Sequence, residues 1–456
     1  MAVSPARVAA FEILMRIEAT EAYASELLHS SRFAKLSPAD HGLLTELVMG
    51  VLRWRGLMDE NIAEHSSQAI AKLDLEVLTA LRLGAYQILF LDRVPKHAAV
   101  NESVDLVKKA HKRSASGLVN AVLRKIDKAG TVFEKHVLQE RSHLYSQGFS
   151  HPHWLVERWK RNFGADAAAR ICEYDQSTPR PVVRIADFRS PKFALGGMPN
   201  YPTVLGAEGT QLEPGKLLSD AFTVTAGDIS QSTAFRERRV AIQDEASQLV
   251  ALLVGNGHAI LDCCAAPGGK TRILGQENPD ATIVAMELHP RRAALLKKLV
   301  TEPNVQVTAA DIRAMPLNRQ FDRILVDAPC SGTGTLARNP DIKWRLKAED
   351  LLRLQSYQIE LLRSAMKYAA TGSRIVYSTC SLEPEENDQV IEKVLAENSE
   401  FRLIDTRDRL LELQSRGELV WPDIDSLLSG PYLRTIPGVH PCDGFFAAIL
   451  EQKSPA

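Results

Sequence analysis

The sequence predicts a multidomain protein, with an all-α N-terminal domain (residues 1–140), a small α+β subdomain (145–238) and a doubly wound α/β C-terminal domain (239–456). Three observations support this division. Apolar residues recur at helical spacing in the first part, strand candidates bounded by Gly- and Pro-rich stretches follow, and strands then alternate with helices. The 456 residues, 45% hydrophobic and 24% charged, suffice for about two to four domains with sizeable cores.

The N-terminal domain is predicted from three apolar stripes with a helical period, separated by short stops at Ser37-Pro38 and Val94-Pro95. The stripes comprise Val8, Phe11, Leu14 and Ile17; Leu43, Leu44, Leu47, Val48, Val51 and Leu52; and Leu75, Leu78, Leu81, Leu83, Ile88 and Leu89. We therefore expect a compact helical domain.

Basic residues cluster in the last two helices expected in this domain. They are Lys108, Lys109, Lys112, Arg113, Arg124, Lys125 and Lys128. Such a cluster can contact the phosphates of a nucleic acid, but a solvated helix face often has the same composition. Both interpretations remain open at the level of the sequence.

The small subdomain is predicted from a change in composition after residue 150. Residues 154–159 begin a helix, residues 179–185 read as a strand after a Pro-bounded turn, and residues 221–224 read as another. The stretch 190–235 is rich in Gly, Pro, Ser and Thr. This pattern is typical of a small α+β fold.

The C-terminal domain has a regular alternation of strands and helices. Strands are predicted at 258–264, 282–287, 305–307, 324–326 and 375–377, and helices at 269–274 and 292–300. This order predicts a doubly wound parallel sheet with right-handed crossovers. In such a sheet the carboxyl ends of the strands face the ligand crevice.

Two cysteines follow strands of this sheet. Cys330 lies in the stretch 327–334, which begins with Asp327, and Cys380 lies in the stretch 378–381. Because strand carboxyl ends meet at one edge, we expect both thiols and the carboxylate at one site. Two thiols and a carboxylate in one crevice suggest covalent chemistry.

A turn of small residues with paired glycines follows the first strand of the sheet. Its members are Cys264, Ala265, Ala266, Pro267, Gly268, Gly269 and Lys270. Such residues let a backbone approach a ligand closely at a helix N-terminus. The spacing matches neither the dinucleotide fingerprint Gly-x-Gly-x-x-Gly nor the phosphate loop Gly-x-x-x-x-Gly-Lys-Ser/Thr.

Acidic residues end the next two strands. Glu287 stands where an acid commonly receives a ribose diol, and Asp311 where it can accept from an adenine amino group. One acid alone would more often be a cap or a surface charge, but Asp327 makes three at consecutive strand ends. Ribose and adenine without a phosphate cradle indicate S-adenosylmethionine as the cofactor, held by the glycine turn and these three acids.

These motifs closely resemble those of the bacterial 16S ribosomal RNA cytosine-C5 methyltransferases of the Sun/Fmu type, within the NOL1/NOP2/Sun family. The resemblance rests on residues 264–270, 327–334 and 379–381, and on further stretches at 243–247, 340–345 and 443–447. Around residues 95–102 and 117–124 the helical part is similar to the RNA-binding NusB antitermination fold. The resemblance covers nearly the whole chain. It implies a NusB-like helical domain, an RRM-like subdomain and a Rossmann-like methyltransferase domain.

The chain departs from the family pattern in three places. Arg184-Ile185-Ala186 stands for the usual Arg-Val-Asn, and Phe235-Arg236-Glu237-Arg238-Arg239 stands for a Gly-rich entry before Gln243. Glu287 replaces the usual aspartate. These departures affect expected RNA contacts in the small subdomain and leave the chemistry intact.

The resemblance implies methylation of C5 of a cytosine in small-subunit rRNA. C5 is too weak a nucleophile to attack a methyl sulfonium unaided, so a thiolate must first add to C6. The family implies that Cys380 is this nucleophile and that Cys330 aids product release. Asp327 would hydrogen-bond the cytosine edge, and Lys270 is a candidate for the positive charge that favours the thiolate.

Several alternatives remain open. Cys330 could be the nucleophile, because Pro329-Cys330 has the Pro-Cys form of the DNA cytosine-C5 methyltransferases. The substrate could be a tRNA, since catalytic motifs are shared across substrates. A non-catalytic RNA-binding assembly factor would be expected to lose Cys380 or the glycine turn, and a dinucleotide oxidoreductase would need the missing phosphate fingerprint.

The target base must be splayed from its neighbours to reach such a site, so it should lie in a loop or be flipped. Trp344, with Lys343 and Arg345, could line the approach through stacking and phosphate contacts. Equally, Trp344 could be an ordinary core aromatic.

Composition sets the remaining expectations. The formal net charge of -1 excludes a uniformly basic nucleic-acid coat but not a local basic stripe. With no signal-like N-terminus and no apolar run near the roughly 18 residues that span a bilayer, we expect a cytoplasmic protein without a membrane partner. The six cysteines are too few for a disulfide framework and lack zinc spacing, so we expect no metal. We expect a monomer.

Overall fold

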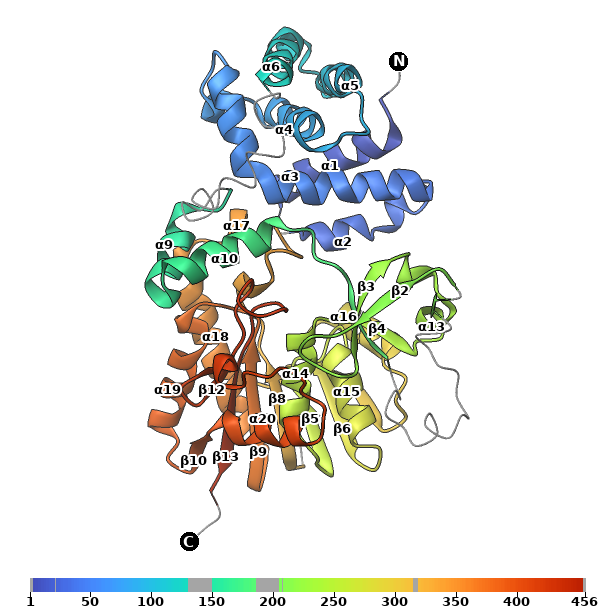
Figure 1. Cartoon of the computed structure of the whole chain (residues 1–456). Helices are drawn as coiled ribbons and strands as arrows, with labels where there is room; N and C mark the ends of the chain where they lie inside the picture. Colours follow the sequence, from blue (N-terminus) through green and yellow to red (C-terminus); the bar gives the residue numbers. More distant parts are fainter. Residues whose placement is uncertain are drawn as a thin grey trace. The chain divides into compact units, whose positions relative to one another are not determined.

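The computed structural model describes residues 3–20, 22–129, 150–185, 205–206, 208–314 and 319–453. Two compact units are formed: Met1–Thr178 with Leu336–Arg345, and Pro179–Thr335 with Leu346–Ala456. The first unit is helical and the second contains two β-sheets (Figure 1). The predicted division into three domains at residues 140 and 239 stays a prediction. Ala186, of the predicted Arg184-Ile185-Ala186 contact, lies outside the described residues.

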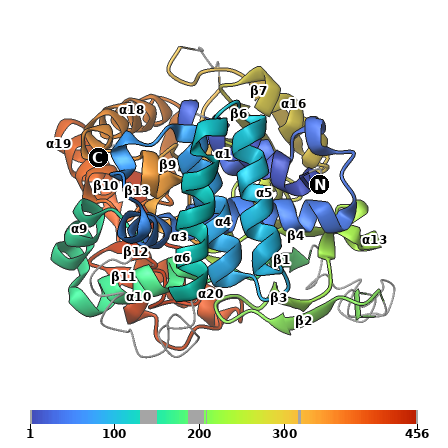
Figure 2. The same ribbon diagram turned by 90° about the horizontal axis from the view of Figure 1, so that it is seen from above.

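The helical unit is built around α4, whose residues from Val77 to Ile88 are all buried. A helix that is apolar on most sides must lie inside a bundle, and α5 and α6 lie beside it (Figure 2). In the described part of the chain no helix is long and apolar enough to cross a membrane. The helices of this unit are α1 (Pro5–Ala19), α2 (Ala24–Leu28), α3 (Pro38–His65), α4 (Leu75–Phe90), α5 (Lys96–Lys109), α6 (Ser116–Ala129), α9 (His153–Phe163), α10 (Ala165–Gln176) and α17 (Ile342–Arg345), with short 3-10 turns η1 (Ser31–Phe33), η2 (Ile70–Lys72) and η3 (Arg113–Ala115).

Helix α17 places the predicted RNA-approach residues inside this unit. Lys343 is only 1% exposed, and its Nζ donates to the carbonyl of Arg53 at 3.0 Å. Burial lowers the pKa of Lys343 to about 7. The Trp344 indole N–H donates to the carbonyl of Leu52 at 2.6 Å. The expectation that Lys343 meets phosphate is therefore wrong, and the structure favours a packing role for Trp344.

The smaller sheet of the second unit is antiparallel, in the order β2-β3-β1-β4. Its apolar face buries Val183, Ile185, Phe222, Val224 and Val240. The elements are β1 (Val182–Ile185), β2 (Gln211–Pro214), β3 (Ala221–Ala226), η5 (Ile229–Gln231), α13 (Thr233–Arg236) and β4 (Val240–Ile242). The predicted strands at 179–185 and 221–224 are confirmed as β1 and β3.

The larger sheet has the order β11-β12-β13-β9-β8-β5-β6-β7, with β10 paired to β13. Strands β9, β8, β5, β6 and β7 are mutually parallel, as predicted. Strands β10 to β13 pair antiparallel, so the sheet is mixed, and the predicted doubly wound parallel sheet is its part from β5 to β9. The strands are β5 (Ala259–Asp262), β6 (Thr282–Glu287), β7 (Val305–Ala309), β8 (Phe321–Asp327), β9 (Ala369–Thr379), β10 (Phe401–Ile404), β11 (Leu428–Ser429), β12 (Tyr432–Arg434) and β13 (Phe446–Gln452).

Helices cover both faces of this sheet (Figure 1). Successive strand residues point to opposite faces, so Leu325 of β8 packs in the core with α14, α15 and α20, whereas Ile324 and Val326 pack with α18 and α19. The helices are α14 (Glu245–Val254), α15 (Gly269–Glu277), α16 (Pro290–Leu299), α18 (Ala348–Met366), α19 (Asp388–Glu397) and α20 (Thr406–Ser415), with 3-10 turns η6 (Thr333–Thr335), η7 (Pro384–Glu386) and η8 (Asp425–Leu427). Strand order reverses at β5, between β6 and β8, where open α/β sheets bind ligands.

Candidate active site

A cavity of about 590 Å³ opens at the carboxyl ends of β5 to β9. The predicted site residues that line it are Cys264, Ala266, Glu287, Asp311, Asp327, Cys330 and Cys380. Apolar walls come from side chains such as Leu288, Ile312 and Tyr357. The topology thus brings the two cysteine stretches and three acids around one space of ligand size.

The glycine turn (residues 264–270) connects β5 to α15 beside this cavity. Gly268 has a φ of 116°, and a Cβ added there would lie 2.7 Å from Val300 Cγ2. Glycine is needed here because the backbone is left-handed and packs directly against the end of α16. Ala265, Pro267, Gly268, Gly269 and Lys270 line a second cavity of about 520 Å³ on the side of the smaller sheet. That second cavity also reaches Cys264, Ala266 and Asp327.

The acids of the first cavity fit S-adenosylmethionine. Glu287 is 4% exposed and its Oε1 accepts from the backbone N–H of His289 at 2.9 Å, while Oε2 lies 3.8 Å from Arg292. Oε2 thus keeps acceptor capacity for a ribose hydroxyl. Arg313 donates hydrogen bonds to the Asp311 carboxylate, one of them at 2.8 Å. These bonds lower the pKa of the Asp311 carboxyl. A carboxylate kept ionised can accept from an adenine amino group.

The Glu287→Ala and Asp311→Ala substitutions are each expected to weaken S-adenosylmethionine binding by roughly ten- to hundredfold, because each removes hydrogen bonds to a charged acceptor. Titration calorimetry of the purified chain measures the effect. Asp280→Ala is the matched control, since Asp280 is an exposed carboxylate on the loop before β6. Unchanged affinity in both variants would contradict the assignment of these acids to the cofactor.

Asp327 lies where the two cavities meet and is fixed from two sides. Lys270 Nζ pairs with Oδ2 of Asp327 at 2.8 Å, and Ser378 Oγ donates to Oδ1 at 2.8 Å. Lys270 also stands over the ring of Phe445, 4.9 Å from its centroid. The carboxylate is therefore oriented before any ligand arrives. The positive charge of Lys270 is thus paired with Asp327. Its other predicted role, to favour the thiolate form of a cysteine, stays a prediction.

The two cysteines meet as predicted from the strand ends. The Sγ atoms of Cys330 and Cys380 lie 3.4 Å apart, within hydrogen-bond distance for sulfur and far longer than a disulfide. All six cysteines of the chain are free thiols. The hydrogen bond to Cys380, together with burial, raises the pKa of Cys330 well above its ordinary value. The two sulfurs can therefore share a proton, with either one as the donor.

A buried carboxylate that the sequence did not reveal joins the two cysteine stretches. Glu386 is fully buried, and its Oε1 accepts from the backbone N–H of Ser331 at 2.8 Å and from Gln358 at 2.9 Å. Its Oε2 accepts from the hydroxyls of Ser331 and Ser381. Ser331 follows Cys330 and Ser381 follows Cys380 in the chain. Glu386 therefore ties the two thiol-bearing loops together.

Every predicted site residue thus lines one of the two cavities, while the role of each stays a prediction. No cluster of three or more His, Cys, Asp or Glu side chains suited to a metal ion occurs among the residues that the structure describes. The site missed by the sequence analysis is the second cavity, since its walls come from two sheets that only the tertiary fold brings together.

Comparisons with known proteins agree with this geometry. The family described as 16S rRNA methyltransferase RsmB/F matches residues 249–451, and the NusB family matches residues 4–128. The chain is 32% identical to the probable ribosomal RNA small subunit methyltransferase B of Bacillus subtilis, over 97% of this chain and 98% of that protein. It is 30% identical to the ribosomal RNA small subunit methyltransferase B of Vibrio cholerae, over 92% of this chain and 91% of that protein.

A solved structure of a methyltransferase homolog protein from Pyrococcus horikoshii is 27% identical and has a TM-score of 0.52, covering 66% of this chain and 95% of that one. The similarity to the two bacterial relatives extends over nearly the whole of each chain, through the helical domain and the larger sheet. The first cavity and its acids agree with a methyltransferase that uses S-adenosylmethionine. The chain therefore belongs to the RsmB/F family of S-adenosylmethionine-dependent 16S rRNA methyltransferases and carries an N-terminal domain of the NusB family.

Proposed function

We propose that this protein methylates C5 of a cytosine in 16S rRNA through a covalent bond between Cys380 and C6. The observation that carries the proposal is the pair of thiols 3.4 Å apart in a cavity that also holds Asp327, Glu287 and Asp311. The relatives named above are ribosomal RNA small subunit methyltransferases, which supports an rRNA substrate.

The first step is carried by the chain's own groups. Cys380 Sγ, as a thiolate, adds to C6, and the electrons of the C5–C6 double bond move into the ring and make C5 nucleophilic. Asp327, oriented by Lys270 and Ser378, is placed to accept from the exocyclic amino group and, once it carries a proton, to donate it to N3, where negative charge develops as the thiolate adds. The bound cofactor supplies an electrophilic methyl group that C5 takes.

Release of the product requires loss of the C5 proton and cleavage of the C6–S bond, which returns the electron pair to Cys380. Cys330 is the group we assign to this stage. Its pKa is raised mainly by the hydrogen bond to Cys380, and a Cys380 tied up as a thioether no longer provides that bond in full. Once Cys380 is a thioether, the Cys330 thiol can release its proton to solvent, and the resulting thiolate accepts the C5 proton.

The reverse assignment, with Cys330 as nucleophile, is less well supported. Cys380 follows the strand next to that of Cys330, and a second thiol at this place matches the RNA methyltransferases that the chain resembles and has no counterpart in the DNA cytosine-C5 methyltransferases. We therefore retain Cys380 as the nucleophile.

Bisulfite sequencing of rRNA from a strain lacking this protein tests the function. We expect one cytosine of 16S rRNA to lose its 5-methyl signal, and the intact gene to restore it. Loss of a signal from tRNA instead would support the tRNA alternative. No change in either RNA would favour a non-catalytic assembly factor.

The basic cluster of the helical unit supports binding of the RNA outside the catalytic cavity. Its residues lie on α5, η3 and α6, except Lys112, which directly precedes η3. Two of them are already paired with acids, Lys108 with Asp105 at 2.9 Å and Lys112 with Asp74 at 2.9 Å. These two are consistent with a solvated helix face, so a phosphate contact must rest on other members of the cluster.

Lys109 and Arg113 are exposed and are the better candidates for phosphate contact. The double substitution Lys109→Ala and Arg113→Ala is expected to weaken binding of a 16S rRNA transcript and to reduce its salt slope by roughly 0.7 to 0.9 per lost contact. Filter binding at salt concentrations of about 50 to 200 mM measures this slope. The paired Lys108→Ala and Lys112→Ala variant is the control. An unaltered slope in the first variant would restore the solvated-face interpretation.

A further inference from the structure

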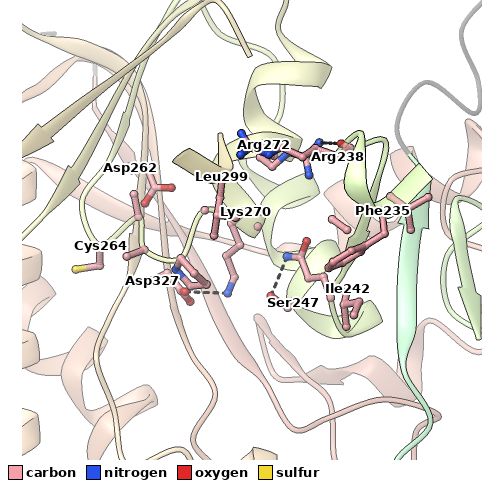
Figure 3. Close-up of a pocket in the computed structure, with 18 of the residues that line it drawn as sticks. Phe235, Arg238, Ile242, Ser247, Asp262, Cys264, Lys270, Arg272, Leu299 and Asp327 are labelled. Carbon is pink, nitrogen blue, oxygen red and sulfur yellow. Dashed lines mark hydrogen bonds and ion pairs between the residues drawn. The ribbon is translucent and has the colours of Figure 1, made fainter. Parts of the chain in front are cut away.

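Outside the glycine turn and Asp327, the residues that line the second cavity have no role in the chemistry described so far. The volume of this cavity is about 520 Å³, enough for one nucleotide, and it lies between the smaller sheet and the glycine turn. Figure 3 shows Lys270 and Asp327 on one side and Phe235 and Ile242 on the other. Because Asp327 lines both cavities, a ligand here would sit next to whatever Asp327 holds in the first one.

Its walls present apolar surface that the fold does not cover. Phe235, the third residue of α13, is half-buried and contributes an aromatic ring. Ile242 at the end of β4 is 49% exposed, and Leu299 at the end of α16 is 37% exposed. Large apolar side chains left open around a concave site favour a flat ligand that packs against them.

Positive charge surrounds the same opening. Arg236 is exposed, and its guanidinium donates only to backbone carbonyls, those of Gln231 at 3.0 Å and Ser232 at 3.4 Å, within the described residues. Arg238 is exposed and stands in the left-handed region, with a φ of 61°. The carbonyl of Arg238 accepts from Arg272 at 2.6 Å, which fixes this backbone over the cavity. Neither guanidinium has a carboxylate within ion-pair distance among the described residues, although Arg236 lies near enough to Glu208 to help lower the pKa of that carboxyl. Arginines of this kind are suited to phosphate.

The interior offers hydrogen-bond acceptors. Gln243 donates through Nε2 to Ser247 at 3.0 Å, and its Oε1 has no partner among the described residues. Asp262 is 1% exposed; its Oδ2 accepts from Thr271 at 2.7 Å, and its Oδ1 has no partner in the same part of the chain. Buried acceptors left open next to a cavity call for a donor from a ligand.

We propose that this cavity binds a nucleotide of the substrate RNA that neighbours the target cytosine, with its base against Phe235, its donor edge towards Gln243 and Asp262, and its phosphate at Arg236 and Arg238. The inference rests on the proposed function, since it takes the target base to be held at Asp327. An aromatic face, arginines and inward acceptors together match a base and its phosphate. The stretch 235–239, which departs from the family pattern, would thereby hold the nucleotide beside the modified base, and Gln243 and Asp262 would read its edge.

The aromatic wall gives the first test, made with the full chain and a 16S rRNA transcript. Phe235→Leu is expected to raise the KM for RNA by roughly five- to hundredfold, as loss of one stacked base implies, and to leave S-adenosylmethionine affinity unchanged. Phe235→Tyr keeps a ring and is expected to stay near the parent protein. Equal effects of Leu and Tyr, or a loss of cofactor affinity in either, would overturn the assignment.

Arg236 and Arg238 give a second test, which does not depend on Phe235. Arg236→Ala with Arg238→Ala is expected to reduce the salt slope of RNA binding by about 0.7 for each lost single-strand phosphate contact. Arg239→Ala is the matched control, because Arg239 pairs with Glu237 at 3.1 Å and does not line this cavity. A slope equal to that of the parent protein would overturn the phosphate contact.

Crosslinking separates this proposal from the proposed function. A 16S rRNA transcript substituted with 4-thiouridine is irradiated with the protein, and the crosslinked peptide is identified by mass spectrometry. We expect a peptide that contains Phe235. If that crosslink forms but no cytosine is methylated, the cavity still binds RNA and the proposed chemistry fails. If methylation proceeds without such a crosslink and Phe235→Leu has the parent KM, the chemistry stands and the second cavity does not bind the neighbouring nucleotide.

Discussion

Cys380→Ala is expected to abolish methylation of 16S rRNA, by roughly 10⁴-fold or more, and to form no covalent complex with RNA. Without the Cys380 thiolate no bond to C6 forms and C5 stays unreactive. Transfer of tritium from labelled S-adenosylmethionine measures the loss of activity. Cofactor affinity, measured by calorimetry, should not change, because Cys380 is assigned to the base and not to the cofactor. That control distinguishes loss of the nucleophile from loss of the fold.

Cys330→Ala is expected to behave differently, although the two Sγ atoms are only 3.4 Å apart. The adduct still forms and C5 still takes the methyl group, but the C5 proton is not removed. A denaturant-resistant protein-RNA band should therefore accumulate on a denaturing gel when RNA and cofactor are both present. A trapped band from Cys380→Ala and none from Cys330→Ala would identify Cys330 as the nucleophile. Full methylation by both variants would remove covalent catalysis from the proposal.

The core of the larger sheet could be predicted because its signals are local. Strand β6 runs over Thr282–Glu287, the residues predicted from their apolar content, and α15 begins at Gly269 as the glycine turn indicates. The antiparallel edge could not be predicted in the same way. Strand β13 pairs with β9 across a long stretch of sequence, and β11 and β12 are too short for a periodic pattern to be seen.

In the candidate site, too, features set by the local sequence could be predicted, and features set by tertiary packing could not. Cys330 and Cys380 could be placed together because each follows a strand of one parallel sheet. The prediction that Lys343 contacts phosphate is wrong, since only packing in the helical unit shows that this lysine is buried. The second cavity depends on the approach of α13 and β4 to the glycine turn, which no spacing in the sequence reveals.

The role of Glu386, too, is revealed only by the tertiary structure. Its substitution tests whether the positions of the two thiols matter for catalysis. Glu386→Ala would leave the Ser331 N–H without its acceptor. It would also remove an acceptor from Gln358, which keeps the Pro329 carbonyl, and from the Ser331 and Ser381 hydroxyls, which lie 3.1 Å from each other. Each buried group left unsatisfied costs about 1–3 kcal/mol, so we expect a loss of roughly 3–5 kcal/mol in unfolding free energy, measured by denaturant titration.

Glu386→Gln separates positioning of the thiols from plain stability. An amide of the same shape keeps one oxygen for Ser331 N–H and Gln358, and the two serine hydroxyls can rotate to accept from its NH₂ group. We therefore expect near-parent stability, unchanged KM for S-adenosylmethionine, and a kcat lowered by roughly tenfold as the loops bearing Cys330 and Cys380 shift slightly. Glu385→Ala, at the preceding position in η7, is the matched control. A Glu386→Gln protein with parent kcat would mean that Glu386 stabilises the fold without setting the distance between the two thiols.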